Sequence, residues 1–224
     1  MRSITFETDE FYHVFNRGNN KRPIFLDEFD LLRFLQSMRE FNTVEPIGSI
    51  YENFFRKKEL GDSIFKQQKL VDLVCYCLNP NHFHLTVKQL VDDGVRRFMH
   101  RVGTGFTKYF NQKYKTSGAL FQGRYKALHV DSNEYLLHLS AYVNLNNRVH
   151  GALGSSTSKL SKTSWDEYTN HERGQTKDRD LCNKEIILAQ FRNPAGYREF
   201  AESSLLTMTI KERKDTERIL KLGS

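Results

Sequence analysis

A buried strand followed by an alternating one limits the folds open to this chain more than any other sequence feature. Residues 70–78 (LVDLVCYCL) are almost entirely apolar, which is typical of a buried strand. The turn formers Asn-Pro-Asn follow, and residues 82–88 (HFHLTVK) alternate as a second strand, so the pair predicts a β-hairpin. Because successive strand residues point to opposite faces, we expect His82 and His84 together on an open face, while the apolar residues between and after them meet helices.

The other periodic segments place this hairpin in an α+β fold. Asp27 can cap a helix that follows the first strand, and Gly103 and Gly105 weaken the prediction in the middle of the longest helix. The expected elements are a strand at 11–15, a helix at 28–41, a helix from 92 or 93 to 114, a strand at 124–130 and a helix from about 132 to 151. This order predicts a ferredoxin-like antiparallel sheet with helices packed mainly on one face.

Two composition changes suggest how the chain is organised. Residues 42–69 carry Pro46, two glycines and many charges, and we expect them to be a long insertion that can be partly helical. Residues 154–164 are rich in serine and predict a linker. We therefore expect a catalytic domain at 1–151, with the insertion inside it, and a linker with a C-terminal helical extension at 152–224.

Positive charge is concentrated in one segment. The chain has a net charge of +7, and residues 94–130 hold eight Lys or Arg with no Asp or Glu. Aromatic residues are interleaved with these cations, which suits a phosphate backbone and stacking bases but also a solvated helix over an aromatic core. The candidate DNA contacts in this segment are Arg96, Arg97, Arg101, Gln122, Arg124 and Lys126.

The remaining composition points to a cytoplasmic protein. No apolar run approaches the roughly 20 residues of a membrane-spanning helix, and the first residues lack the layout of a signal peptide. Three cysteines are present, and the spacing of Cys75 and Cys77 is that of strand neighbours, which argues against disulfides and zinc clusters. We expect no membrane partner.

Two pairs of residues could form parts of a catalytic or metal-binding site. His82 and His84 are close enough on one strand face to share a metal ion, although this spacing also occurs by chance. Tyr142 and Asn146 are neighbours on one helical face and offer a phenol and an amide oxygen. Taken alone, each of these residues is also compatible with an ordinary structural role.

In combination, these motifs resemble the HUH single-strand transposases with one catalytic tyrosine, the IS200-like group, and within it the REP-associated tyrosine transposases. Two departures are the length of the 42–69 segment and Asn147, where the family usually shows proline. The matching segments are 12–19 (YHVFNRGN), 77–85 (CLNPNHFHL), 121–126 (FQGRYK) and 142–146 (YVNLN), with weaker matches at 164–168 (SWDEY) and 187–200.

The resemblance implies a metal-dependent DNA strand transferase. In the family pattern His82, His84 and Asn146 hold Mg²⁺ or Mn²⁺, and Tyr142 attacks single-stranded hairpin DNA to leave a 5′-phosphotyrosine and a free 3′-hydroxyl. Arg17 joins Gln122, Arg124 and Lys126 as an expected DNA contact, although all four also suit a solvated sheet edge. The resemblance also implies a bacterial, DNA-associated protein that is a monomer or a homodimer.

Two other functions remain open at this point. A DNA hairpin-binding protein with little or no cleavage activity would carry the same residues. A histidine-based phosphodiesterase would use the HxT/S motifs at 84–86 and 138–140, but it needs both on strands, and 138–140 falls in a predicted helix. A histidine-triad hydrolase would need a histidine at Thr86.

Overall fold

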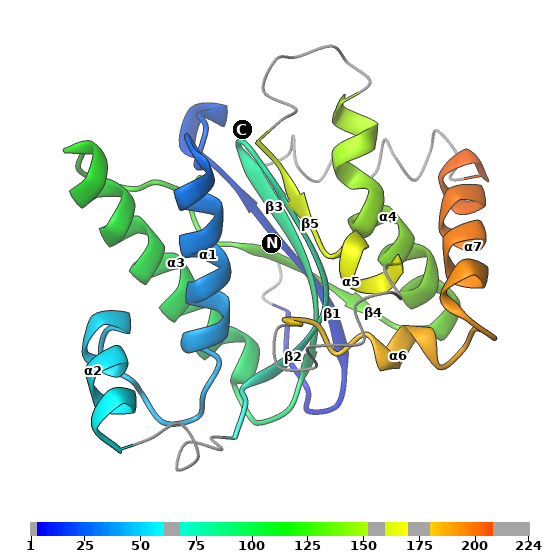
Figure 1. Ribbon diagram of the computed structural model, residues 1–224, viewed down its shortest axis with the longest axis horizontal. Coiled ribbons are helices and arrows are strands. Elements are labelled where there is room, and N and C mark those ends of the chain that lie inside the picture. The colour runs from blue at the N-terminus through cyan, green and yellow to red at the C-terminus, as the bar shows by residue number, and fades with distance from the viewer. Residues whose placement is uncertain (1–3, 61–67, 152–159, 170–179, 208–224) are drawn as a thin grey trace.

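Five antiparallel strands organise the chain in the computed structural model, which describes residues 4–60, 68–151, 160–169 and 180–207 (Figure 1). Their spatial order is β4-β1-β3-β2-β5. The strands are β1 (Phe11–Arg17), β2 (Val71–Asn79), β3 (His82–Gln89), β4 (Lys126–Val130) and β5 (Lys162–Thr163).

The predicted ferredoxin-like topology is confirmed. The chain runs from β1 through a helix to β2, turns directly into β3, and passes through a second helix to β4 beside β1. The turn between β2 and β3 contains only Pro80 and Asn81, and the Pro80 carbonyl accepts hydrogen bonds from the N–H groups of Ile24 and Phe25. The predicted hairpin is therefore present, and its turn is fixed by the segment after β1.

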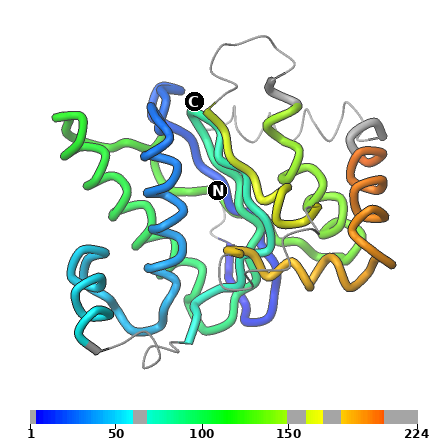
Figure 2. Tube along the Cα trace, in the orientation of Figure 1, coloured from blue at the N-terminus to red at the C-terminus, as the bar shows by residue number. Residues whose placement is uncertain are grey.

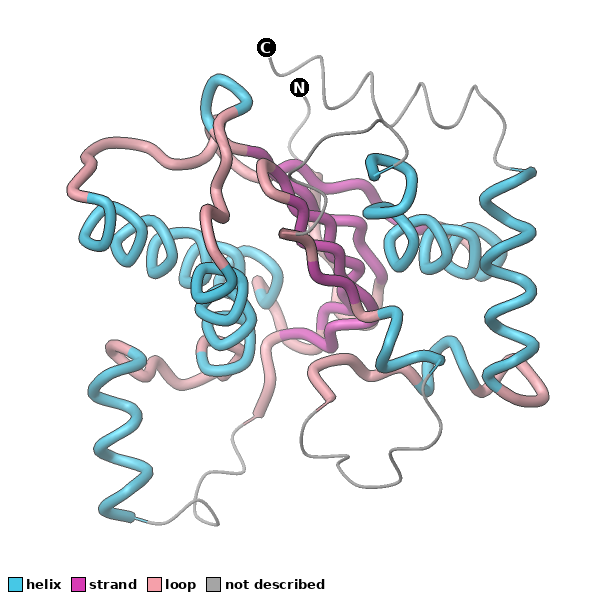
Figure 3. The backbone as a smooth tube through the Cα atoms, turned by 45° about the horizontal axis from the view of Figure 1, so that its top comes forward, coloured by secondary structure: helices cyan, strands magenta, loops and turns pink. Residues whose placement is uncertain are grey.

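The helices cover both faces of the sheet, which corrects the expectation that they pack mainly on one face. Helices α1 and α3 lie on one side and α4, α5 and α7 on the other (Figures 1 and 3). No described helix is long and apolar enough to cross a membrane. The helices are η1 (Asn19–Lys21), α1 (Glu28–Glu40), α2 (Ile50–Leu60), α3 (Gly94–Tyr114), α4 (Asn133–Gly151), α5 (Trp165–Thr169), α6 (Glu185–Leu188) and α7 (Pro194–Thr207).

The core under α1 and α3 is built from aromatic rings. Phe34 of α1 contacts Phe83 of β3 and Phe106 of α3 at ring-centroid distances of 5.2 and 5.0 Å. α3 continues without a break through its two glycines, and a Cβ atom on Gly105 would lie 2.6 Å from the Phe41 ring. A glycine at this position lets α3 approach the end of α1 closely. This packing accounts for the presence of a glycine inside the helix, which weakened the helix prediction.

Some predicted boundaries change in the structure. The 42–69 insertion contains α2, and residues 61–67 lie outside the described part. The last sheet strand of the ferredoxin unit begins at Lys126, so Arg124 lies before the strand and not within it.

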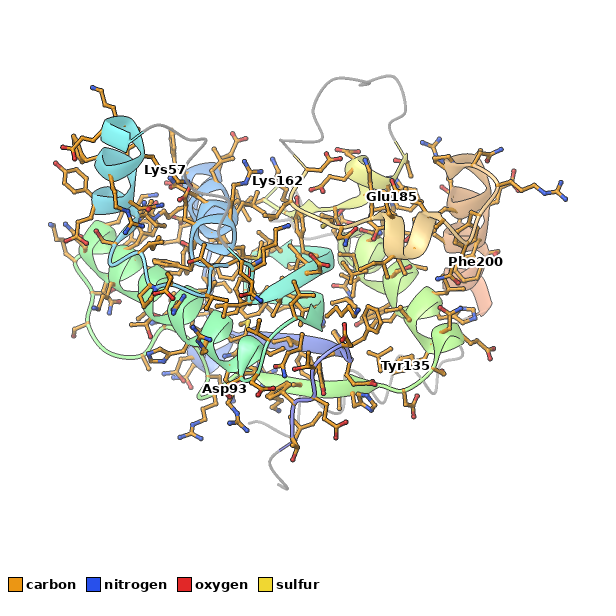
Figure 4. The ribbon with its side chains drawn as sticks, turned by 90° about the horizontal axis from the view of Figure 1, so that it is seen from below. Lys57, Asp93, Tyr135, Lys162, Glu185 and Phe200 are labelled. Atoms are coloured by element: carbon orange, nitrogen blue, oxygen red, sulfur yellow. The ribbon has the colours of Figure 1, made fainter. Side chains whose placement is uncertain are left out.

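The segment after α4 returns to the sheet. β5 pairs with β2 at Cys77↔Thr163, and α7 packs against α4, as the backbone tube shows (Figure 2). Figure 4 shows Lys57 of α2 and Phe200 of α7 at opposite sides of the molecule, with the sheet between them. Residues 154–159 of the predicted linker lie outside the described part, and the division at 151/152 remains a prediction.

A polar cluster joins the start of α1 to the end of α3. Asp27 caps α1 in a reciprocal capping box with Asp30, whose side chain is fully buried. Lys113 Nζ lies 2.7 Å from a carboxylate oxygen of each aspartate, and Tyr109 and Tyr114 donate to Asp30 at 3.0 and 2.8 Å. The buried charge of Asp30 is thereby paired and hydrogen-bonded, as burial of a charge requires.

We expect Lys113→Met to lower the free energy of unfolding by about 2 kcal/mol, because it removes the cation that compensates a buried carboxylate, discounted for the partial exposure of Lys113. Urea denaturation at pH 7 measures the effect. Lys108→Met, on the exposed side of the same helix, serves as the control and should change stability by less than about 0.5 kcal/mol. Equal losses in both variants would contradict the role of the cluster.

The cost of Lys113→Met should also depend on pH. Burial by itself would raise the pKa of Asp27, but hydrogen bonds from Lys113 and from the Asp30 N–H hold that pKa below its ordinary value of 3.8. A depressed carboxyl pKa stabilises the fold above the unfolded-state pKa, and this stabilisation is lost as the pH falls through the folded-state pKa. The difference between the variant and the wild type should therefore shrink below about pH 4.

Candidate active site

The alternation of β3 separates a structural face from a chemical face. Phe83 points to α1, whereas the His84 ring lies edge-on to the ring of Tyr142 on α4, with 5.7 Å between the centroids. The predicted split between the apolar and histidine sides is therefore confirmed. The histidine side is not open as expected, because α4 covers it and leaves His84 fully buried.

Four predicted site residues come together between the hairpin and α4. The rings of His82 and His84 are 5.2 Å apart between centroids, and Tyr142 lies against His84. Asn146, one helical turn after Tyr142, is buried and reaches the end of β2 through Asn79. Their roles as nucleophile and metal ligands remain predictions, but their meeting in one place follows from the fold.

The hydrogen bonds of His82 define which of its ring nitrogens faces the site. Asn81 Oδ1 lies 2.7 Å from His82 Nδ1, and Asn79 Nδ2 lies 3.0 Å from His82 Nε2. An amide oxygen accepts and an amide nitrogen donates, so His82 carries its proton on Nδ1 and presents a lone pair at Nε2.

His84 has a second histidine behind it. His13 Nε2 on β1 lies 2.9 Å from His84 Nδ1, and the two rings stack with centroids 5.2 Å apart. Burial lowers the pKa of His13 to about 3, so this ring is neutral at physiological pH. A neutral His13 can accept the Nδ1 proton of His84, which directs Nε2 of His84 away from β1.

Asn79 joins the two halves of the site. Its Nδ2 atom donates to His82 Nε2 and also, at 2.8 Å, to Asn146 Oδ1. The sequence predicts Asn79 and Asn81 as turn formers, and it leaves open whether His13 lies near a metal ion or is a hydrogen-bonded sheet residue. The sequence feature that could have revealed the contacts of Asn79 and Asn81 with His82 is their place in the turn beside it. In a tight hairpin the last residue of β2 pairs with the first residue of β3, here Asn79 with His82.

A buried polar chain holds α4 against the sheet and α7. Asn144 Nδ2 donates to the Tyr197 hydroxyl at 2.8 Å, and Asn144 Oδ1 accepts from Ser164 Oγ. Ser164 Oγ in turn accepts from the main-chain N–H of Tyr76 on β2 at 2.9 Å. This chain fixes the turn of α4 that lies between Tyr142 and Asn146.

Four of the predicted DNA contacts lie on or next to the β1 side of the site. Arg17 is the register partner of His82, and its Nε donates to Gln122 Oε1. Lys126 pairs with Phe15, which itself pairs with His84, and burial together with Arg17 lowers the pKa of Lys126. Arg124 is exposed in the same segment. These cations border the chemical face from the β1 side.

The three predicted contacts on α3 are not brought to this site. Arg97 and Arg101 donate to the main-chain carbonyls of residues 43 and 44, and Arg96 pairs with Asp93. Their helix lies on the opposite side of the sheet from α4 (Figure 1). The basic segment is thus divided between two faces, and DNA contact by these three arginines remains a prediction.

The HxS motif of the phosphodiesterase alternative does not have the required structure. His138 lies on α4, where its Nδ1 is 3.1 Å from Ser204 Oγ of α7, and not on a strand beside His84. The paired-strand arrangement that this alternative needs is therefore absent at residues 138–140.

Part of the chain is similar to known proteins. Residues 56–146 match the family model described as "Transposase IS200 like", a span that includes His82, His84, Tyr142 and Asn146. No curated protein matches the chain. The chain is also similar to a solved structure described as "Structure of the REP associates tyrosine transposase bound to a REP hairpin", with 12% identity and a TM-score of 0.42, over 67% of this chain and 74% of that chain.

We expect Tyr197→Phe to loosen α4, because it leaves the buried amide of Asn144 without its acceptor at a cost of about 1–3 kcal/mol. Hydrogen exchange read by mass spectrometry should show faster exchange of α4 amides and little change in α1 and α3. Tyr135→Phe, an exposed tyrosine of the same helix, is the control. A uniform rise in exchange over the whole chain would contradict a specific role in holding α4.

Proposed function

We propose that this chain is a metal-dependent single-stranded DNA endonuclease and strand transferase with Tyr142 as its nucleophile, a proposal supported by the match of residues 56–146 to the IS200-like transposase family model. The observation that carries the proposal is the convergence of Tyr142 with His82, His84 and Asn146 at one end of the hairpin. This places a phenol, two imidazoles and an amide beside one another, which are the groups that the proposed reaction needs.

The donor atoms suit a divalent cation. His82 Nε2 and Asn146 Oδ1 both accept from the same nitrogen of Asn79, so two lone pairs are directed at one position. We propose that His82, His84 and Asn146 hold Mg²⁺ or Mn²⁺ there, since imidazole nitrogen and amide oxygen are ligands that Mn²⁺ accepts. Such an ion would polarise the scissile phosphate and reduce the charge that opposes attack.

The residues of the chain would supply the rest of the reaction. The Tyr142 oxygen would form a bond to phosphorus while the bond from phosphorus to the 3′-oxygen breaks, leaving a 5′-phosphotyrosine. The phenol proton would pass to solvent, and the departing 3′-oxygen would take up a proton to become a hydroxyl. Because the phosphodiester is retained in the tyrosine ester, attack by a 3′-hydroxyl would reverse the step and join strands.

The cations beside the hairpin would bind the strand. Arg17 of β1 and Lys126 of β4 border the proposed cation site, Gln122 in the loop before β4 accepts from Arg17, and exposed Arg124 extends the positive surface. Phosphate oxygens are the preferred partners of such side chains, which would set the path of the DNA without reading its sequence. A hairpin is the substrate that the resemblance to REP-associated tyrosine transposases implies.

The decisive test is a covalent protein–DNA adduct. Wild-type protein, Mn²⁺ and labelled single-stranded hairpins from repeats that flank its own gene should give a labelled band at protein size on a denaturing gel. Tyr142→Phe and chelation should each reduce that band by at least about 10³-fold, because they remove the nucleophile or the ion. Tyr135→Phe, on the same helix, should retain it.

A native gel separates the proposal from its alternative. Retarded DNA without any covalent band in the wild type would favour a DNA hairpin-binding protein that does not cleave. A covalent band that survives Tyr142→Phe would mean that another residue is the nucleophile and would refute the assignment.

We also expect Arg17→Ala to weaken hairpin binding by about 1–3 kcal/mol and to reduce the salt dependence of the binding constant by about one ion. Fluorescence anisotropy with labelled DNA at several salt concentrations measures both. Arg96→Ala, on the opposite side of the sheet, tests the alternative path of the DNA along α3 and should change affinity much less if the strand follows β1. A larger effect of Arg96→Ala would place the DNA along α3 instead.

A further inference from the structure

The side chain of Asn79 occupies the centre of the proposed cation site. It is the last residue of β2, is only 3% exposed, and pairs in register with His82. Its amide nitrogen donates to His82 Nε2 at 3.0 Å and to Asn146 Oδ1 at 2.8 Å. These are two of the atoms to which the proposed function assigns the metal.

A single N–H₂ group that bridges two acceptors is the kind of donor that a cation replaces. Both acceptors direct lone pairs at the same point, and a buried lone pair needs either a hydrogen or a metal ion. The Asn79 amide meets that need when no ion is bound. An ion that enters the site must therefore displace the nitrogen of Asn79 from this position.

The same side chain can serve the ion after that displacement. The oxygen and the nitrogen of an asparagine amide are nearly equal in size, and rotation about the Cβ–Cγ bond exchanges their places. After such a rotation Oδ1 would face the position that Nδ2 occupies, toward His82 and Asn146. An amide oxygen is an accepted ligand of Mg²⁺ and Mn²⁺.

We propose that Asn79 is a ligand of this cation site: its amide nitrogen satisfies His82 and Asn146 in the ion-free protein, and its amide oxygen binds the cation in the loaded protein. This inference rests on the proposed function, because it takes the location of the cation from there. It adds a residue from β2 to a site otherwise made by β3 and α4.

The composition of such a site has a chemical consequence. Two neutral imidazoles and two neutral amides leave the charge of a divalent ion uncompensated by the protein. The ion would then draw its balancing negative charge from the phosphodiester, so DNA and cation would strengthen each other's binding.

Two substitutions at Asn79 should shift cation affinity in opposite directions. Asn79→Asp places a carboxylate at the site and should tighten binding of Mn²⁺ alone, in the absence of DNA, by tenfold or more. Asn79→Leu keeps the approximate size without a ligand atom and should weaken it by about ten- to a hundredfold. Electron paramagnetic resonance of free Mn²⁺ during titration of the full chain gives both constants.

Gln36→Glu is the matched control for added charge. Gln36 is exposed on α1, on the other side of the sheet, and accepts from Arg33, so its conversion should leave Mn²⁺ affinity within about twofold. Thermal unfolding without metal identifies any variant that fails to fold. General damage to the fold would weaken binding in both Asn79 variants and could not produce a tighter one.

The outcomes separate this inference from the proposed function. If the wild type binds Mn²⁺ and forms the Tyr142 adduct but both Asn79 variants bind Mn²⁺ equally well, Asn79 is not a ligand and the proposed function stands. If neither the wild type nor Asn79→Asp binds Mn²⁺, the cation site is refuted together with its extra ligand. Opposite shifts in the two variants establish Asn79 as part of the site.

Discussion

The buried amide of Asn144 determines where the helix with Tyr142 lies. Its nitrogen and oxygen are both used, toward Tyr197 of α7 and Ser164 beside β5, and Ser164 continues the chain of hydrogen bonds to β2. A buried amide loses free energy if either half is left unsatisfied, so sliding or rotation of α4 is costly. Because Tyr142 and Asn146 flank Asn144 on this helix, the positions of both depend on those bonds.

The hairpin provides the other half of the site, and its histidines are also held by uncharged hydrogen-bond partners. His82 and His84 each bond through Nδ1 to a neutral neighbour, Asn81 or His13, and neither neighbour is a carboxylate. Such partners orient an imidazole without adding negative charge beside it. The resulting face is polar, and Arg17 and Lys126 lie along its β1 side, so a negatively charged phosphodiester would find cations there.

The sequence predicts the parts of this arrangement that depend on periodicity. The two-residue alternation places His82 and His84 on one face, and the helical repeat places Tyr142 beside Asn146. Sequence periodicity does not predict that α4 covers that face, because the covering depends on Ser164 and Tyr197, which are distant in the chain. The count of positive charge in the sequence likewise does not show that Arg97 and Arg101 donate to main-chain carbonyls of the 43–44 segment. The proposed role of Asn79 depends on the register of β2 and β3, which is visible only in three dimensions.

The groups that hold α4 come after it in the chain, and this order has a consequence during protein synthesis. The histidine hairpin and the tyrosine helix emerge from the ribosome first, whereas Ser164 and then Tyr197 emerge later. Domains generally fold as their residues become available, from the N-terminal side onward. An incomplete chain would hold both halves of the proposed site without the contacts that bring them into register. The proposed nuclease would therefore become competent only late in translation, and nascent fragments would not cut DNA.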